Sequence, residues 1–350
     1  MRIHGGNKRD IKLDLSVSVN PKGMPSKCRA AITDSIDDIV RYPETECEQL
    51  KNELSDRNGG HHIILGSGAS ELIYAICHYM SRKYKEYTAL TAAPSFMEYE
   101  YAIKASGGWV RVCSTREDQD FSITEDICAY VDTDVQLVFV CNPNNPTGEL
   151  IDRHLIEQLA DKCAVADTVL VVDECFLRFS EHYSAYTMTK CLDRYPNVIV
   201  LDDFAKFFCL PGLRLGYGVC SDEELINLIR LQIQPWNLTV TAQKAGLAAL
   251  NDPVFEAESI RYIARERNNM IAGLRECGLE VIGDPAANFI MFRAGEGLRE
   301  ELNKQGIDIR DCSDMMKYHD THGLYFRTAV STHENNERLI RAIKDIKASE

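Results

Sequence analysis

Asp203-Phe-Ala-Lys206-Phe-Phe-Cys-Leu-Pro-Gly-Leu-Arg214-Leu-Gly-Tyr-Gly is the most informative stretch of the chain. It surrounds Lys206 with aromatic residues and sets Arg214 eight positions further on. A lysine amine is a good nucleophile only when it is unprotonated, and apolar surroundings or a neighbouring cation favour that form. Because most lysines are solvated surface groups, the stretch predicts a reactive lysine only if other parts of the chain complete a site.

Two upstream motifs place polar side chains directly after predicted strands. Asp173 closes the apolar run 169–172, and Asn145 lies in a proline-bracketed turn after the run 135–141. Parallel sheets bind ligands at the carboxyl ends of their strands. A carboxylate there can pair with the protonated ring nitrogen of a cofactor, and an amide can donate to a phenolate oxygen. Taken alone, Asp173 is more often a helix-capping residue in a turn, and the structural alternative for Asn145 is a plain Pro-Asn-Asn-Pro turn.

A third motif, Gly66-Ser-Gly-Ala-Ser-Glu71, joins a predicted strand to a predicted helix. Free N–H groups and the positive end of a helix bind phosphate at such a junction. A glycine turn with a capping box is the structural alternative. Phe96 follows the next predicted strand and is placed to stack on a bound ring, although a single phenylalanine is more often a core residue.

Composition restricts the possible functions. The chain has 350 residues and a net charge of −14, which argues against a nucleic-acid or anionic-membrane partner. No apolar run reaches the roughly 18 residues of a membrane span. The thirteen cysteines are dispersed without a Cys-x-x-Cys pair, so we expect reduced thiols and no metal site. The first residues lack a signal-peptide pattern, and we therefore expect a cytoplasmic protein.

Short apolar runs alternate with amphipathic helical segments through most of the chain, which is typical of an α/β protein with a mostly parallel, seven-stranded sheet between helices. The runs are residues 62–65, 87–92, 109–113, 135–141, 168–172, 198–201 and 215–219. After residue 235, two long helices (239–250 and 252–277) precede four shorter strands (279–282, 288–292, 307–310 and 325–328) and a final helix (333–348). We expect an N-terminal arm and helix (1–40) packed with a small α/β domain (236–350), and a large domain (41–235).

With these motifs assembled, the chain resembles the fold-type I pyridoxal phosphate (PLP) enzymes of the aminotransferase class I/II superfamily over essentially its whole length. Within that superfamily it is most similar to the threonine-phosphate decarboxylases of cobalamin synthesis, which are relatives of the histidinol-phosphate aminotransferases. The marks of this branch are His4-Gly-Gly-Asn7, the segment 14–25, Arg41-Tyr42-Pro43, the lysine segment 206–217, and Gln234-Pro-Trp236-Asn.

The resemblance implies roles for matching positions around the cofactor. Lys206 would form the Schiff base, Asp173 would pair with the pyridine nitrogen and Asn145 would donate to the phenolate oxygen. The other implied cofactor contacts are the phosphate ligands Gly68, Ala69, Ser70 and Arg214, the stacking ring of Phe96, Asp203 three positions before the lysine, and Tyr42, which would reach the phosphate in the other subunit. Tyr42 therefore implies a homodimer with active sites at its interface.

The resemblance also implies a small amino-acid substrate that carries a phosphate. Arg327 matches the arginine that clamps the substrate carboxylate bidentately, and Arg310 matches a second arginine at the far, phosphorylated end. The remaining implied substrate contacts are Asn145, His4 and Asn7.

Three positions depart from the pattern of the superfamily. Asp203 stands where a serine or threonine usually donates to the cofactor phosphate, and a carboxylate about 4 Å from a phosphate costs on the order of 4 kcal/mol per charge pair at an effective dielectric constant of 20. Phe176 replaces a tyrosine that hydrogen-bonds the cofactor in many aminotransferases. Ser331 replaces an arginine found in many of the decarboxylases.

The sequence thus leaves three functional readings. The leading one is decarboxylation of L-threonine O-3-phosphate to (R)-1-aminopropan-2-yl phosphate. The second is transamination, in which Lys206 takes the Cα proton and passes it to the cofactor. The third is a non-catalytic paralogue that binds or regulates. Motif spacing does not separate the first two, because they differ only in which Cα bond lies perpendicular to the cofactor ring.

Overall fold

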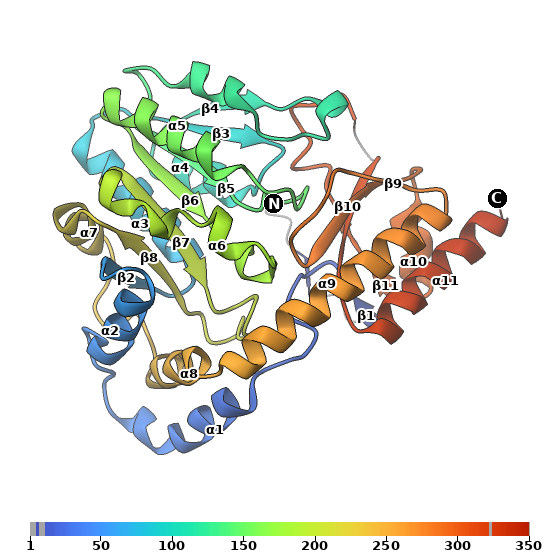
Figure 1. The fold of residues 1–350 in the computed structure, drawn as a ribbon, viewed down its shortest axis with the longest axis horizontal. Helices are drawn as coiled ribbons and strands as arrows, with labels where there is room; N and C mark the ends of the chain where they lie inside the picture. The colour runs from blue at the N-terminus through green and yellow to red at the C-terminus, as the bar shows by residue number, and fades with distance from the viewer. Residues whose placement is uncertain (1–4, 7–10, 322–323, 350) are drawn as a thin grey trace.

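A computed structural model describes residues 5–6, 11–321 and 324–349 of the chain (Figure 1). Its centre is a seven-stranded sheet with the strand order β2-β8-β7-β6-β5-β3-β4. The strands are β2 (His62–Gly66), β3 (Thr88–Ala93), β4 (Trp109–Ser114), β5 (Leu137–Cys141), β6 (Val169–Asp173), β7 (Val198–Asp203) and β8 (Gly216–Cys220). Only β8 runs antiparallel to its neighbours. All seven predicted strands are confirmed, with ends displaced by one or two residues.

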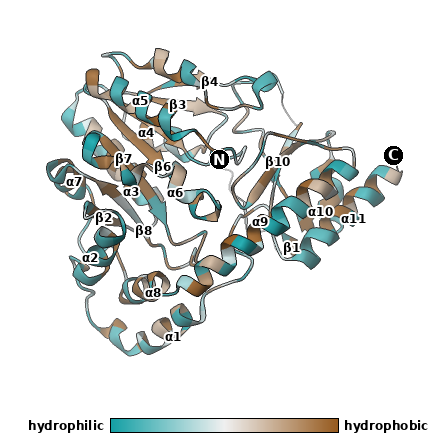
Figure 2. Cartoon of the chain, in the orientation of Figure 1, coloured by the Kyte–Doolittle hydropathy of each residue, from teal (hydrophilic) through white to brown (hydrophobic). Residues whose placement is uncertain are grey.

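The central strands are buried on both faces, as Figure 2 shows by their apolar colouring. In β5, Val138 and Val140 belong to one hydrophobic cluster, whereas Leu137, Phe139 and Cys141 belong to another. Alternate side chains of a strand point to opposite faces, so each face needs its own helical layer. The surrounding helices are α2 (Glu48–Arg57), α3 (Ala69–Lys83), α4 (Glu98–Ala105), α5 (Arg153–Val165), α6 (Tyr183–Tyr186) and α7 (Glu223–Arg230).

A smaller antiparallel sheet follows, with the order β12-β13-β10-β9. Its strands are β9 (Glu280–Val281), β10 (Phe289–Arg293), β12 (Arg310–Asp311) and β13 (Tyr325–Ala329), and its helices are α9 (Pro253–Glu276), α10 (Leu298–Lys304) and α11 (His333–Ser349). Asp252 accepts the N–H of Phe255, and Pro253 occupies the first turn of α9. Asp252 therefore caps this helix, and Pro253 fits its first turn, where a backbone N–H is not needed.

The strand predicted over 307–310 is wrong as a single element. Ile307–Asp308 (β11) pairs in parallel with Leu13–Asp14 (β1), whereas Arg310–Asp311 (β12) pairs with β13 in the antiparallel sheet. Only Ile309 separates the two short strands, and its side chain is fully buried. The N-terminal segment supplies the backbone partner of β11, and strand periodicity alone does not reveal such a partner.

The N-terminal part of the chain contacts residues from beyond position 235 twice. β1 joins β11, and α1 (Ser26–Asp34) packs on α8 (Val240–Leu250). The short 3-10 helices are Ile36–Val40, Glu117–Gln119, Glu125–Tyr130, Leu177–Phe179, Met188–Lys190 and Leu192–Arg194. Among the described residues, no helix combines the length and hydropathy that a membrane crossing needs. The division of the chain at residues 40 and 235 stays a proposal.

Candidate active site

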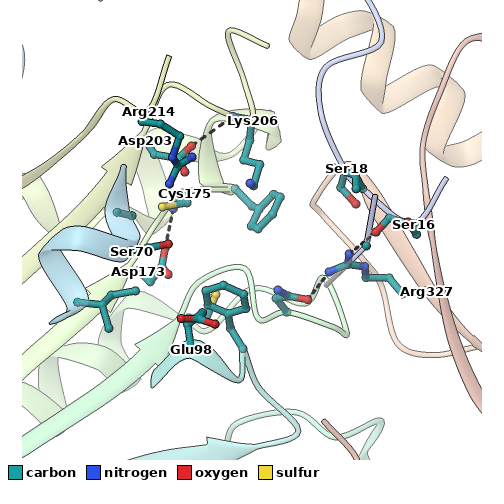
Figure 3. Close-up of a pocket in the computed structure, with 18 residues that line it drawn as sticks. Ser16, Ser18, Ser70, Glu98, Asp173, Cys175, Asp203, Lys206, Arg214 and Arg327 are labelled. Atoms are coloured by element: carbon teal, nitrogen blue, oxygen red, sulfur yellow. Dashed lines mark hydrogen bonds between the residues drawn. The ribbon is translucent and has the colours of Figure 1, made fainter. Parts of the chain in front are cut away.

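A cavity of about 430 Å³ opens where the central strands end (Figure 3). Asp173 is the last residue of β6 and Asp203 the last of β7, and Asn145 follows β5 by four positions. The predicted residues that line the cavity are Ala69, Ser70, Phe96, Asn145, Asp173, Asp203, Lys206, Arg214 and Arg327. The structure therefore brings together groups that the sequence spreads over more than 250 positions.

One end of the cavity is an anion cradle formed by the start of α3 and by Arg214. Gly68 has a φ of +82°, and a Cβ on this residue would lie 2.5 Å from a guanidinium nitrogen of Arg214. A Cβ on Gly216 would lie 2.5 Å from the backbone nitrogen of Ala69. Ala69 and Ser70 are in the first helical turn, whose N–H groups have no carbonyl partner within the helix. Both glycines thus allow a close approach that aims N–H donors and a cation at one point.

The glycine turn with a capping box, the structural alternative for residues 66–71, is partly correct. The N-cap residue Gly68 has no side chain to cap with, but the Glu71 carboxylate accepts the N–H of Ser67 at 2.6 Å. Asn237 donates to the same carboxylate oxygen at 2.6 Å. The Glu71 carboxylate thus fixes the turn before α3 by accepting the Ser67 N–H. Ala69 and Ser70, which follow this turn, border the cavity.

Asp173 is held from two sides. Its Oδ1 accepts the N–H of Cys175 at 3.1 Å, and its Oδ2 accepts the Tyr99 hydroxyl at 2.6 Å. The residue is only 5% exposed and borders the cavity. A fixed carboxylate at this place can pair with a cationic ring nitrogen.

Arg327 is a buried cation without a carboxylate hydrogen-bond partner among the described residues. Its Nη1 donates to Oδ1 of Asn145 at 2.5 Å, its Nη2 donates to the Ser16 carbonyl at 3.0 Å, and its Nε makes no hydrogen bond. Burial lowers the pKa of Arg327 to about 10. A buried charge is costly unless it is paired, so this end of the cavity favours an anionic ligand. Since Oδ1 of Asn145 is engaged, its NH₂ group is left to donate.

Lys206 projects between these two ends. Its Nζ lies 5.9 Å from the ring centroid of Phe176, and its backbone carbonyl accepts the N–H of Asn20 at 3.0 Å. Its backbone N–H donates to Oδ1 of Asp203 at 3.2 Å. The main chain is therefore fixed on both sides of the lysine, and the amine reaches into the cavity over an aromatic face.

The Asp203 carboxylate contacts both the turn before Lys206 and the cavity. Its Oδ1 accepts the N–H groups of Ala205 and Lys206, so the carboxylate closes the turn before the lysine. It also borders the cavity beside Arg214, as Figure 3 shows. Burial raises the pKa of Asp203 to about 6, with the Lys206 charge acting in the opposite direction. An acid that titrates near neutrality thus stands next to the anion cradle.

Several predicted contacts are not in the cavity lining. Both carboxylate oxygens of Asp314 accept hydrogen bonds from Arg310, at 2.6 and 2.8 Å, and Arg310 lies opposite Arg327 on neighbouring strands. Tyr42 is 80% exposed and contacts Trp236 with a ring-centroid distance of 4.9 Å and an interplanar angle of 39°. His4 and Asn7 lie outside the described residues, but Gly5 between them borders the cavity.

The cavity also contains residues that the sequence reasoning did not assign. Ser18 is 3% exposed, and its hydroxyl has no hydrogen-bond partner while it borders the cavity near Arg327 (Figure 3). Glu98, Cys141 and Cys175 are further buried lining residues. Ser18 lies in the segment 14–25, which sequence analysis used only as a mark of resemblance. Its place in the site follows from the pairing of β1 with β11.

Comparisons with known proteins agree with this geometry. The family model "Aminotransferase class I and II" matches residues 10–343. The chain belongs to this family. It is 32% identical to a threonine-phosphate decarboxylase of Salmonella typhimurium (98% of this chain, 96% of that protein) and 32% identical to histidinol-phosphate aminotransferase 2 of Archaeoglobus fulgidus (95% and 93%). The crystal structure of a histidinol-phosphate aminotransferase from Clostridium acetobutylicum has a TM-score of 0.88 at 27% identity (97% and 100%).

Members of the aminotransferase class I and II family are PLP-dependent enzymes, and this chain is one of them, a decarboxylase or an aminotransferase. The residues that line the cavity suit each part of PLP. The glycine cradle suits a phosphate, Asp173 suits a pyridine nitrogen, and the Lys206 amine lies between them. Phe96 borders the same space and offers a ring for stacking.

We expect Asp203→Ser to bind PLP more tightly than the wild type at pH 7 to 8. Ionised Asp203 repels the phosphate, and a serine hydroxyl donates to it while still able to accept a turn N–H. The gain should stay below the roughly 4 kcal/mol of the unscreened pair, which suggests a dissociation constant lower by about 3- to 30-fold. Fluorescence titration of the apoprotein measures it.

The pH dependence gives the internal control for this substitution. Burial raises the Asp203 pKa to about 6, so the carboxylate is largely ionised at pH 7 to 8, and its repulsion of the phosphate is lost as the pH falls through 6. Wild-type affinity should therefore rise more steeply than that of Asp203→Ser between pH 8 and pH 5.5. Equal affinities and equal slopes would mean that Asp203 serves only to close the turn.

Proposed function

We propose that this enzyme removes the α-carboxylate of a phosphorylated hydroxy-amino acid, with L-threonine O-3-phosphate as the preferred substrate. The products would be CO₂ and (R)-1-aminopropan-2-yl phosphate, which would serve cobalamin synthesis. The observation that carries the proposal is buried Arg327, a cation that borders the cavity with Lys206 and has no carboxylate hydrogen-bond partner among the described residues. The Salmonella relative named above supports the choice of substrate.

Each cavity residue has a separate role in the proposed reaction. Arg327 binds the substrate carboxylate, and its bond to Asn145 orients that amide toward the cavity. When bound, PLP supplies an electron sink for the charge that develops at Cα. The Lys206 amine would hold the proton that Cα receives after the carboxylate departs, and it would then release the product. Phe176 and Phe96 limit the access of water to this centre.

Transamination is the second candidate, and one observation favours it. Arg310, which the resemblance places at the substrate phosphate, already binds both oxygens of Asp314. A substrate phosphate would have to share or displace this carboxylate, whereas an unphosphorylated amino acid would need only Arg327. At the same level of identity, the Archaeoglobus relative supports transamination by its name, although its named substrate carries a phosphate.

One assay separates the two activities. Incubation of the PLP-loaded enzyme with L-threonine O-3-phosphate, without any keto acid, should release CO₂ and aminopropanol phosphate in equal amounts. L-threonine without the phosphate serves as the matched substrate and should react at least about tenfold more slowly, because it loses a charge-assisted contact. Turnover that requires 2-oxoglutarate and yields glutamate would instead assign the enzyme to transamination.

A homodimer is the second part of the proposal. Large apolar side chains that are half or more exposed gather at Ile36, Ile39, Val40, Tyr42 and Trp236. Such a patch is typical of an interaction surface. We propose that a second copy covers it and that Tyr42 reaches the cofactor phosphate of that copy.

Mixing two inactive variants tests the shared site. Lys206→Ala and Tyr42→Ala chains, each inactive alone, should regain up to about a quarter of wild-type activity after refolding together, because a hybrid C₂ dimer contains one intact site. A monomeric mass in light scattering, or no recovery on mixing, would contradict the shared site.

The cysteines support a place in the cytoplasm, which we include in the proposal. All thirteen are free thiols in the structure, and most are buried. Free, dispersed cysteines used as small core residues are typical of proteins in a reducing compartment.

A further inference from the structure

Tyr99 connects the helical layer to the floor of the active site. It lies in α4, and its hydroxyl donates to Oδ2 of Asp173, 74 positions further along the chain, at 2.6 Å. The second oxygen, Oδ1, accepts the N–H of Cys175. A carboxylate has about four acceptor positions. Two of them are therefore fixed by protein donors, and the carboxylate has one orientation.

The Tyr99 ring is itself held in place by aromatic neighbours. It stacks on Phe139 of β5 with a centroid distance of 4.9 Å and an interplanar angle of 5°, and it meets Phe96 edge-on at 5.6 Å. No part of Tyr99 is exposed. Phe96 also borders the cavity, where a cofactor ring would stack on it. The three contacting rings of Phe96, Tyr99 and Phe139 therefore fix both this stacking surface and the hydroxyl that donates to Asp173.

Tyr99 keeps its proton under all ordinary conditions. Burial raises its pKa well above the usual value of 10, and the charge of Asp173 acts in the same direction. The phenol is therefore a permanent donor. Its hydrogen bond therefore always has the Asp173 carboxylate as the acceptor.

We propose that Tyr99 is a positioning residue of the reaction, which fixes the Asp173 carboxylate in the orientation that would pair with the ring nitrogen of bound PLP. This inference depends on the proposed function, because it requires that the cavity binds PLP. Without the Tyr99 donor, the carboxylate would lose this fixed orientation, and its pairing with the ring nitrogen and the electron sink would weaken.

Tyr99→Phe tests the proposal, because it removes one oxygen and keeps the ring packing. Tyr87→Phe is the matched control. Tyr87 is 2% exposed, belongs to the same hydrophobic cluster and bonds Ser106 at 2.6 Å, but it does not border the cavity. The primary readout is the ¹⁵N chemical shift of the ring nitrogen in labelled PLP bound to each variant. Steady-state kinetics and the PLP dissociation constant are the secondary readouts.

For Tyr99→Phe, we expect the ¹⁵N shift to move toward the unprotonated value, and kcat to fall about 10-fold with KM within about 2-fold, as expected for one bond to a charged group. Tyr87→Phe should match the wild type in the shift and in kcat. A wild-type shift in folded Tyr99→Phe would overturn the proposal. Failure of the wild type to bind PLP would refute the proposed function instead, so the two failures are distinguishable.

Discussion

Lys206→Ala should lose at least about 10⁴-fold in kcat, the upper range for a single positioned acid–base group. The loss should exceed that of any other single substitution in the cavity, because the lysine serves both as the covalent attachment point and as the proton carrier. The absorbance band of covalently held PLP should disappear with the activity. Product analysis and a visible spectrum of the purified protein measure the two effects.

The fold should survive this substitution. The hydrogen bonds at this position, to Asn20 and to Asp203, use the backbone of residue 206 and not its side chain. Lys206→Arg is the matched variant, since it keeps the cation but cannot form the covalent bond, and it should be as inactive as Lys206→Ala. Lys162→Ala, on the exposed face of α5, should behave as the wild type. Normal turnover by Lys206→Ala would refute the whole assignment.

Arg327→Met should raise KM for an amino-acid substrate by about 100-fold or more, since truncating one partner of a buried, hydrogen-bonded charge pair costs about 2–5 kcal/mol. Arg327→Lys should recover only part of the loss, because a lysine cannot bind a carboxylate bidentately. Steady-state kinetics over a wide range of substrate concentrations would measure both variants.

The stability of these variants distinguishes a binding arginine from a structural one. Arg327 donates only to an amide oxygen and a backbone carbonyl, so its removal leaves no buried carboxylate unpaired and should lower Tm by no more than the loss of two ordinary hydrogen bonds. Arg267→Met is the control, because buried Arg267 donates to the carbonyls of Ala286 and Ala287 outside the cavity. That variant should lower Tm and leave KM unchanged. A strong loss of Tm in Arg327→Met with normal KM would contradict the binding role.

The large sheet could be predicted from the sequence because its signal is local. The run 135–141 is apolar at every position except Gln136, which is typical of a strand buried on both faces, and β5 is buried at every position. The candidate cofactor residues were predictable for a related reason. Asp173, Asn145 and Lys206 each lie just beyond a strand, and parallel strands end at the same edge of a sheet.

Sequence by itself therefore predicted the α/β architecture, the candidate lysine and the two separate parts of the anion cradle, since each depends on residues a few positions apart. Only the tertiary structure decided the contacts that tune the site. Tyr99 reaches Asp173 across 74 positions, and Arg327 reaches Asn145 across 182 and Ser16 across 311. Arg310 is bound to Asp314, although the two lie only four positions apart. Spacing places side chains near a sheet edge, but the packing of separate segments decides which partner each one meets.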